Sequence, residues 1–276
     1  MPGPQDTYTH GHHASVLRSH AARTAENSAG YLRSHLQRGL SLLDVGCGPG
    51  SITMDFAELL APGRVVGIER SETAVASARA AAEPAQLDNL EFAVGDVYAL
   101  DFADDSFDIV HAHQVLQHLS DPVAALVEMQ RVCRPGGIIA VRDADYSAMT
   151  WYPESSGLER WMGLYLSVAR GNGGEPDAGR HLLAWAHAAG LSAIEPSASV
   201  WCYATPQTRT EWGQTWAVRV TESEFASQAV AAGQASPADL DELAGAWREW
   251  SAEPDGWFTV PHGELICFAA GPAIRP

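Results

Sequence analysis

Short apolar runs alternate with stretches of helical periodicity along the first half of the chain. Buried parallel strands have such continuous apolar runs, because helices cover both of their faces. The runs lie at 42–45, 64–69, 90–94, 107–112 and 138–141. The helical spacing lies at 51–60, 71–82 and 122–132. An alternation of this kind predicts an α/β fold with a mostly parallel sheet.

Residues that favour helix starts stand at the boundaries of these stretches. Ser71 is suited to cap one helix, and Asp121-Pro122 is suited to start another. Further upstream, the apolar spacing over 14–36 predicts two short helices, and Thr24 is a suitable cap for the second. Residues 1–39 are therefore expected to form an N-terminal helical lid.

The second half of the chain is less regular and richer in aromatic residues. Strands are expected at 198–204 and 264–270, and helical insertions at about 151–190 and 208–255. We expect residues 40–276 to form one Rossmann-like domain with a seven-stranded sheet, helices on both faces and an antiparallel last strand. The Trp and Tyr residues of the insertions leave two interpretations open. In the first, these aromatic side chains pack the helices against the sheet or against a partner subunit. In the second, they line an apolar pocket.

Composition excludes some classes of function. The 276 residues carry a formal charge of −17, and all 17 basic residues are arginine. Nucleic-acid binding needs basic patches, so this acidic chain argues against it. No apolar run approaches the length of a membrane span, and no signal-peptide pattern begins the sequence. We expect a cytoplasmic protein with a small neutral or apolar ligand, and leave association with a second copy open.

Neither the cysteines nor the N-terminal histidines form a clear metal motif. Four cysteines are scattered among apolar neighbours, as buried free thiols in a reducing compartment are. They are Cys47, Cys133, Cys202 and Cys267. His10, His12 and His13 cluster, but no Cys, Asp or Glu lies at ligand spacing nearby. We favour a partly ordered lid over a metal site here, and expect no bound metal.

A glycine-rich turn joins the first strand to the first helix. Gly46, Gly48 and Gly50 allow a sharp turn, where a ligand can approach bare backbone and the free N–H groups of the helix N-terminus. The dinucleotide pattern Gly-x-Gly-x-x-Gly would need glycine where Ser51 and Thr53 stand. A nicotinamide-dependent oxidoreductase is thus disfavoured and is kept as an alternative to be tested.

Several pieces of this half, taken together, resemble one family. Asp44-x-Gly46-x-Gly48-x-Gly50 resembles the first motif of class I S-adenosylmethionine-dependent methyltransferases. Further matches are Glu69, Gly95-Asp96-Val97, Phe107-Asp108-x-Val110 and Arg134-Pro135-Gly136-Gly137. The matches cover about residues 42–141 and are most similar to the ubiquinone- and menaquinone-biosynthesis type. The resemblance implies S-adenosylmethionine as the cofactor and a small molecule as the methyl acceptor.

The resemblance also implies which residues contact the cofactor. Glu69 would accept hydrogen bonds from ribose hydroxyls, and Asp96 would accept one from the adenine amino group. Asp44 would supply a negative charge beside the sulfonium cofactor, and Tyr8 would belong to the covering lid. The predicted set is Tyr8, Asp44, Gly46, Cys47, Gly48, Glu69, Arg70, Asp96, Val97 and His113.

Methyl transfer to an oxygen or an acidic carbon also needs a base, which should lie near the ends of strands four and five. Histidine titrates close to neutral pH, so it suits this role. We predict His118 first and His113 second, with Asp145 and Tyr146 as weaker candidates. His111 lies inside strand four and is expected to be a core residue. The sequence leaves methylation of carbon, oxygen or nitrogen open.

The acceptor is expected to be hydrophobic and aromatic or terpenoid-like, as in secondary metabolism. The insertions should cover strands four and five, and they are rich in Trp and Tyr and contain no lysine. Another class of function fits the same motifs. It is an S-adenosylmethionine-binding protein that couples methylation to cyclisation or has lost catalysis.

Overall fold

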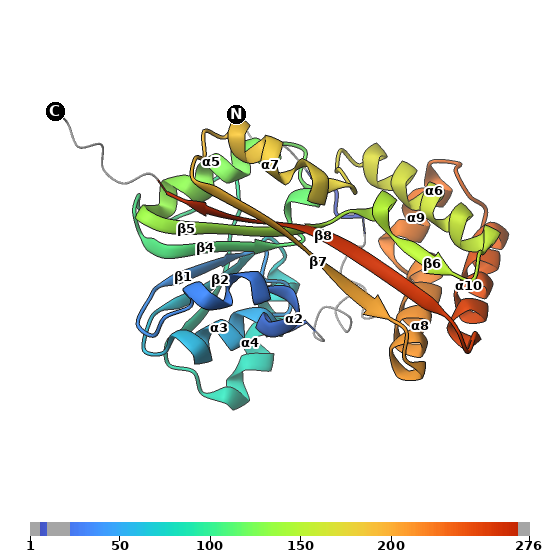
Figure 1. Ribbon diagram of the computed structural model, residues 1–276, viewed down its shortest axis with the longest axis horizontal. Coiled ribbons are helices and arrows are strands. Elements are labelled where there is room, and N and C mark those ends of the chain that lie inside the picture. Colours follow the sequence, from blue (N-terminus) through green and yellow to red (C-terminus); the bar gives the residue numbers. More distant parts are fainter. Residues whose placement is uncertain (1–5, 10–22, 270–276) are drawn as a thin grey trace.

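The computed structural model describes residues 6–9 and 23–269. Its centre is an eight-stranded sheet, in which β1 to β5 pair in parallel as predicted (Figure 1). The sheet order is β3 (Leu90–Val94), β2 (Val65–Glu69), β1 (Leu42–Val45), β4 (Phe107–His113), β5 (Cys133–Ala144), β8 (Trp257–Phe268) and β6 (Thr150–Tyr152). β7 (Ile194–Tyr203) also pairs with β8.

The structure confirms the antiparallel last strand, because β8 runs antiparallel to β5. The predicted number of strands was one too low. The missed strand, β6, pairs with β8 where the first helical insertion was expected to begin. β7 and β8 are also longer than predicted, since they pair from Ile194↔Cys267 to Tyr203↔Phe258. Much of β7 is exposed and polar, so it gives no continuous apolar run.

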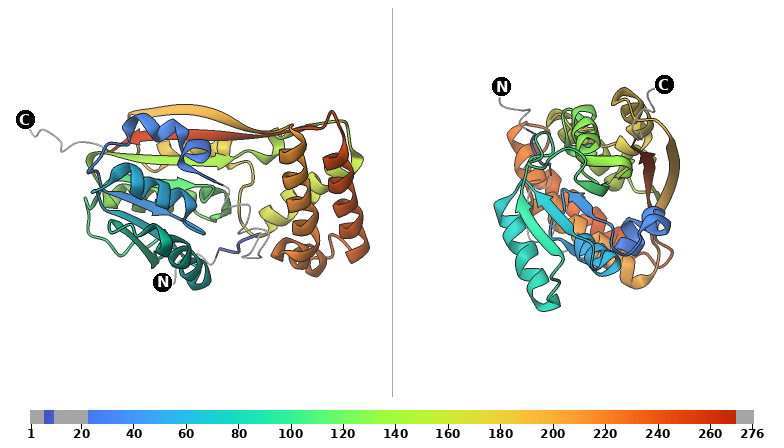
Figure 2. Two further views of the ribbon diagram at one scale, coloured as in Figure 1. Left: turned by 90° about the horizontal axis from the view of Figure 1, so that it is seen from below. Right: turned by 90° about the vertical axis from the view of Figure 1, so that its left-hand side faces the viewer.

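Helices cover both faces of the parallel part of the sheet. The short α2 (Ala25–Ser28), α3 (Ser51–Leu60) and α4 (Glu72–Ala82) lie on one face. α5 (Pro122–Val132) and α7 (Ala178–Ala188) lie on the other face, as the two views of Figure 2 show. This arrangement confirms the predicted Rossmann-like fold.

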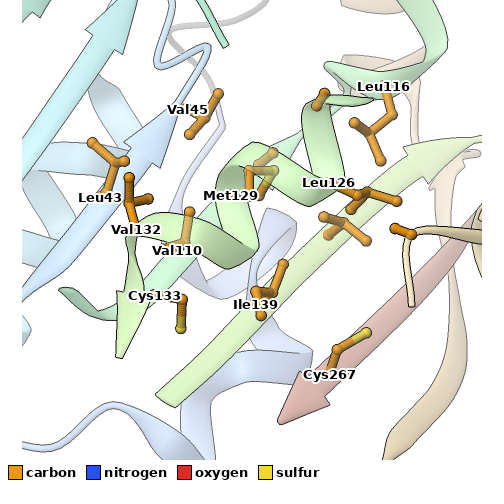
Figure 3. Packing of buried hydrophobic residues seen from close by; sticks show 14 of the residues in the cluster. Leu43, Val45, Val110, Leu116, Leu126, Met129, Val132, Cys133, Ile139 and Cys267 are labelled. Carbon is orange, nitrogen blue, oxygen red and sulfur yellow. The ribbon is translucent and has the colours of Figure 1, made fainter. Parts of the chain in front are cut away.

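Successive residues of a strand point to opposite faces of the sheet, so the same strands contribute to a hydrophobic core on each face. Leu43, Val110 and Ile139 pack with Leu126 and Met129 of α5 (Figure 3). The residues next to them in the strands pack against α3 instead. Full burial of one such side chain contributes about 1.5–3 kcal/mol to folding. The carboxyl ends of the parallel strands are therefore held at one fixed edge.

The predicted helix caps are confirmed. The side chains of Thr24, Ser71 and Asp121 each accept a hydrogen bond from the backbone N–H three residues further on. The helix that follows Thr24 is only one turn long and continues as a 3₁₀ helix over Gly30–His35. The first predicted N-terminal helix and the cluster of His10, His12 and His13 lie outside the described residues.

Four helices form a separate lobe at the far ends of β7 and β8 (Figure 1). We call this the helical lobe, and it consists of α6 (Ser156–Gly171), α8 (Pro206–Glu222), α9 (Glu224–Ala231), α10 (Pro237–Ala252) and β6. Trp161 lies at its centre, with ring centroids 4.5 Å from Trp216 and 4.7 Å from Trp247. These three indoles are fully buried, so they build the core of the lobe. Helix packing therefore accounts for most of the aromatic residues of the insertions.

The four cysteines are free thiols, as predicted. Cys202, however, is exposed on β7, so the prediction that it is buried was wrong. Alternation along this outer strand turns its side chain to the surface. In the part of the chain that the structure describes, no helix combines the length and the apolar character that crossing a bilayer requires.

Candidate active site

A cavity of about 390 Å³ lies beyond the carboxyl ends of β1, β2 and β4, and we call it the first cavity. Residues far apart in the sequence meet in its wall. They include every residue predicted to contact the cofactor and both histidines predicted as bases. These are Tyr8, Asp44, Gly46, Cys47, Gly48, Glu69, Arg70, Asp96, Val97, His113 and His118. Ligands bind at this edge in open α/β sheets, and the volume suits a small organic molecule.

The loop after β1 requires glycine for two separate reasons. Gly46 and Gly50 have φ angles of 68° and 82°, which lie in the left-handed region. In addition, a Cβ atom on Gly46 would stand 2.4 Å from Cγ2 of Val115. The backbone of the loop therefore passes closer to the segment after β4 than any other residue would allow. Its bare surface forms one wall of the first cavity.

Asp44 is buried beside this loop, and both of its oxygens have partners. Its Oδ1 lies 2.7 Å from Nδ1 of His111, and its Oδ2 accepts a hydrogen bond of 2.6 Å from Thr53 Oγ1. Asp44 thus ties β1 to β4 and to α3 where the glycine loop begins. His111 is completely buried in this contact, which confirms that it is a core residue.

The other two predicted carboxylates stand at the rim. Glu69 Oε1 accepts hydrogen bonds from the backbone N–H groups of Arg70 and Ser71, at 2.8 and 3.2 Å. Its Oε2 accepts one of 3.3 Å from Gly48, so it links the end of β2 to the glycine loop. Asp96 is exposed and accepts a hydrogen bond of 3.0 Å from the N–H of Tyr98. Each carboxylate keeps acceptor capacity for a ligand.

The segment at residues 6–9 crosses from the cofactor side to the helical lobe. Asp6 accepts hydrogen bonds from the N–H and hydroxyl groups of Ser120, at 2.8 and 2.7 Å. At the other end, Asn172 at the end of α6 donates a hydrogen bond of 3.1 Å to Thr9 Oγ1. Tyr8 lies between them and lines the first cavity. Residues 6–9 therefore lie across one side of the first cavity, fixed at both ends.

A second cavity, of about 310 Å³, adjoins the first. Tyr8, Arg23, Gln114 and His118 line both cavities. Most of the remaining wall comes from β7, from α8 and from the end of β5 and the chain just after it, and Asn27, Gln117 and Val260 complete it. A molecule in the second cavity would therefore lie directly beside a ligand in the first.

His118 occupies this junction as a neutral ring. Its Nε2 lies 3.0 Å from Nε2 of Gln117, whose Oε1 accepts a hydrogen bond of 3.2 Å from the N–H of Ala144. Because the amide oxygen has that partner, the amide nitrogen is the donor, and His118 Nε2 is the unprotonated acceptor. Burial, opposed by Asp6 and reinforced by the charge of Arg23, lowers the pKa of His118 to about 3.

His113 and its neighbour Gln114 form a second polar group at the end of β4. Burial lowers the pKa of His113, whose ring lies 6.3 Å from that of His262 and nearly parallel to it. Gln114 has a φ of 55°, which is uncommon for a residue other than glycine and is often found at functional sites. Its Oε1 accepts a hydrogen bond of 2.7 Å from Arg23, and its Nε2 lies 2.8 Å from His262 Nε2.

The two weaker candidates for a base are placed differently. Asp145 forms two hydrogen bonds with Arg180, of 2.6 and 2.5 Å, and lines neither cavity. Tyr146 does line the second cavity, where its ring stacks on Tyr165 with 4.2 Å between centroids. Burial raises the pKa of Tyr146 above its ordinary value of 10. Asp145 is thus held outside the cavities by its ion pair with Arg180, and the hydroxyl of Tyr146 keeps its proton near neutral pH.

The wall residues that sequence reasoning missed include three with polar side chains at the second cavity, Arg23, Gln114 and Arg219. Arg219 had a usable signal, since it follows Trp212 by seven residues and Trp216 by three on α8. Those spacings place it on the tryptophan face of the helix, where an arginine is unexpected. Gln114 directly follows a predicted strand. Arg23 had no signal, because only the fold brings it to the cavities.

Comparisons with known proteins agree with this geometry. Residues 36–182, more than half of the chain, match the family described as a methyltransferase domain. An uncharacterised methyltransferase of Schizosaccharomyces pombe is 36% identical over 96% of this chain and 97% of that protein. The demethylmenaquinone methyltransferase of Lactococcus lactis is 34% identical over 42% of this chain, which spans 47% of that relative.

Among solved structures, phosphoethanolamine N-methyltransferase 2 of Haemonchus contortus superimposes with a TM-score of 0.59. It is 16% identical, and the match covers 95% of this chain and 58% of that one. That protein was solved with phosphomonomethylethanolamine and S-adenosylhomocysteine, and at this identity the likeness shows the fold alone. The family match and the full-length relative, together with the glycine loop, show to which family this chain belongs. It belongs to the class I S-adenosylmethionine-dependent methyltransferases and uses S-adenosylmethionine as its cofactor.

Proposed function

We propose that the protein methylates carbon or oxygen of a small molecule with an aromatic or otherwise apolar body. One observation carries this proposal, namely that two cavities adjoin and share a wall. The first cavity holds the residues of the methyltransferase motifs, and the second has flat aromatic walls. Because the reaction is an in-line displacement, it needs two ligands in contact in a fixed orientation.

The residues of the first cavity fit the cofactor. A Cβ atom at position 46 of its glycine wall would clash with Val115, and carboxylates of Glu69 and Asp96 line the same cavity. Glu69 would hold the ribose hydroxyls, Asp96 the adenine amino group beside Val97, and the backbone at Gly46 to Gly48 the amino acid part. The cofactor supplies an electrophilic methyl group on a sulfonium.

The chain's own residues would then orient the acceptor, exclude water and accept a proton. Tyr8 belongs to the segment that covers both cavities, and its ring meets that of His118 edge-on, 4.7 Å between centroids. His118 is neutral in the protein as described, so its ring can take a proton from the acceptor once the Gln117 amide moves aside. The enclosed walls would keep competing water away from the methyl group.

The test is a binding and product experiment. Calorimetry should show that S-adenosylhomocysteine binds and that NAD does not, which separates this function from the oxidoreductase alternative. Incubation with S-adenosylmethionine and a metabolite extract, followed by mass spectrometry, should show a product heavier by one methyl group. Binding of NAD in place of S-adenosylhomocysteine would overturn the proposal.

A second candidate function is binding of the cofactor without simple methyl transfer, as in cyclisation or a protein that has lost catalysis. Two observations favour it. Burial holds the pKa of His118 at about 3, and Gln117 occupies the nitrogen that would accept the proton. Tight binding of S-adenosylhomocysteine with no methylated product would decide for this function. We place either activity in secondary metabolism and in the cytoplasm, where the four free thiols would stay reduced.

A further inference from the structure

The charges in the wall of the second cavity differ from those of the chain as a whole. The sequence has 34 acidic and 17 basic residues. Yet the described residues that line the second cavity include two arginines, Arg23 and Arg219, and no Asp or Glu. The wall of the first cavity also has two arginines, Arg23 and Arg70, but it adds four carboxylates, from Asp6, Asp44, Glu69 and Asp96.

Both guanidinium groups are held in place by aromatic rings. Arg219 is 4% exposed, and its Cζ lies 5.2 Å from the ring centroid of Trp216. Arg23 has its Cζ 5.5 Å from the ring centroid of Trp201 and donates to Gln114. A guanidinium that lies over a ring has its five N–H groups in its own plane, so the ring restricts the directions in which they can donate. The two cations are therefore preorganised instead of mobile.

Burial makes the charged form of both guanidinium groups less favourable, and a bound anion would offset this effect. Burial lowers the pKa of Arg23 to about 10, and the charge of Arg219 acts in the same direction. Burial likewise lowers the pKa of Arg219, and the strongest charge effects that oppose this come from tyrosines, Tyr146 first. Two positive charges, Arg219 buried and Arg23 half-buried, with no carboxylate among the described residues of the cavity wall, favour a ligand that brings one.

We propose that the second cavity binds a small carboxylic acid with a flat apolar body, whose carboxylate contacts Arg219 and whose methyl-accepting atom lies beside His118. This inference rests on the proposed function and makes its substrate class more specific. Arg219 lines only the second cavity, whereas His118 lines both, so the acid group and the reacting atom would lie at opposite ends. Rings of Tyr146, Tyr203 and Trp212 would contact the body of the acid between them.

A carboxylate fits this wall better than a phosphate does. Phosphate groups commonly bind to glycine loops and helix N-termini, where several backbone N–H groups converge. The described wall of the second cavity contains no glycine, and its one residue in the first turn of an α-helix, Asn27 of α2, already donates its backbone N–H to Thr24 Oγ1. A guanidinium group can bind the two oxygens of a carboxylate through two parallel N–H···O bonds, without backbone donors beside it.

The experiment compares acids with their neutral amides in calorimetric titrations, with S-adenosylhomocysteine at saturation. The pairs are benzoate and benzamide, 4-hydroxybenzoate and 4-hydroxybenzamide, and indole-3-acetate and indole-3-acetamide. We expect at least one acid to bind the unaltered protein tenfold or more tightly than its amide. Arg219→Met should reduce that preference below threefold, and Arg219→Lys should retain part of it. Arg248→Met is the matched control, because it removes an exposed charge on α10 and should change nothing.

Each outcome decides the inference. If every amide binds as tightly as its acid, or if Arg219→Met keeps the preference, the carboxylate site is wrong. Phenyl phosphate serves as the other arm, and tighter binding of it than of benzoate by tenfold would replace the carboxylate with a phosphate. Unaltered S-adenosylhomocysteine affinity shows that the Arg219 variants are folded. Failure of S-adenosylhomocysteine to bind the unaltered protein would instead remove the proposed function itself.

Discussion

The two cavities are built on different physical principles although they share a wall. Backbone and short side chains form the first cavity, in which the glycine loop follows β1 and carboxylates stand at the ends of strands. Long side chains form much of the second, and they come from the helical lobe, from β7 and from the N-terminal region. The first cavity depends on the sheet, and the second depends on how the lobe packs against it.

This difference explains how specificity can vary within one fold. The backbone at Gly46 has almost no freedom, because Val115 stands where a Cβ atom would lie. By contrast, Arg219 and Trp212 contribute side chains from α8, a regular helix in which most residue types can adopt the backbone conformation. A cofactor site made of backbone is constant in chemistry, whereas an acceptor site made of side chains can change its charge.

The largest effect is expected at the residue where the two cavities meet. His118→Gln should lower turnover of the acceptor found by mass spectrometry by a factor of about 10² to 10⁴, since general-base catalysis contributes that much. Affinity for S-adenosylhomocysteine should stay within twofold, because the first cavity keeps its loop and carboxylates. His187→Gln is the control, being exposed on α7. Unchanged turnover in His118→Gln would show that the residue is not the base.

Acidification should destabilise the region between the cavities. His113, His118 and His262 all have pKa values lowered by burial, so only the unfolded chain gains their protons below pH 6.5. Burial raises the pKa of Asp143 to about 7, and this acts in the opposite direction over the range from 3.8 to 7. Each group changes stability by about 1.4 kcal/mol per pH unit. Three groups act against one, so the folded state should lose stability between pH 6.5 and 5, by at most about 4 kcal/mol.

Urea unfolding at the two pH values measures this loss. His113→Phe should remove the share of one histidine, since neither of its ring nitrogens has a hydrogen-bond partner among the described residues. His187→Phe alters an exposed ring and should leave the pH dependence as it was. Equal stability at pH 6.5 and 5 would contradict neutral burial of the three rings.

The difference between features set by the local backbone and features set by tertiary packing also explains what could be predicted from the sequence. Periodicity and glycines identified β1 to β5 and the wall of the first cavity, because local backbone rules determine both. β6 and the length of β7 were not predictable, since pairing with β8 sustains them in place of an apolar run of their own. Arg23 was not predictable either, because only tertiary packing brings it within 2.7 Å of Gln114.

A pair of glycines tests whether close approach, and not only backbone conformation, makes the first cavity. Gly46 and Gly233 have nearly equal φ angles, 68° and 66°. Nothing lies within 4 Å of a Cβ atom at Gly233, whereas Val115 would be 2.4 Å from one at Gly46. Gly233→Ala should cost only the left-handed conformation, about 1–2 kcal/mol of stability. Gly46→Ala should also weaken S-adenosylhomocysteine binding roughly 100-fold, about 2.7 kcal/mol. Similar affinities of the two variants in calorimetry would contradict this.

The smallest expected effect concerns the ribose assignment at the rim. Glu69→Ala should weaken S-adenosylhomocysteine binding by about 1.5–3 kcal/mol, which is the usual contribution of hydrogen bonds to a charged group. Glu69 also holds Gly48 and Arg70 by backbone hydrogen bonds, so some of the loss could come from a displaced loop. Glu69→Gln separates the two causes, because the amide keeps one acceptor for the loop and loses the charge. Glu72→Ala, exposed in the first turn of α4, is the control for net charge. Unchanged affinity in Glu69→Ala would remove the ribose assignment and leave Asp96 as the first rim carboxylate to examine.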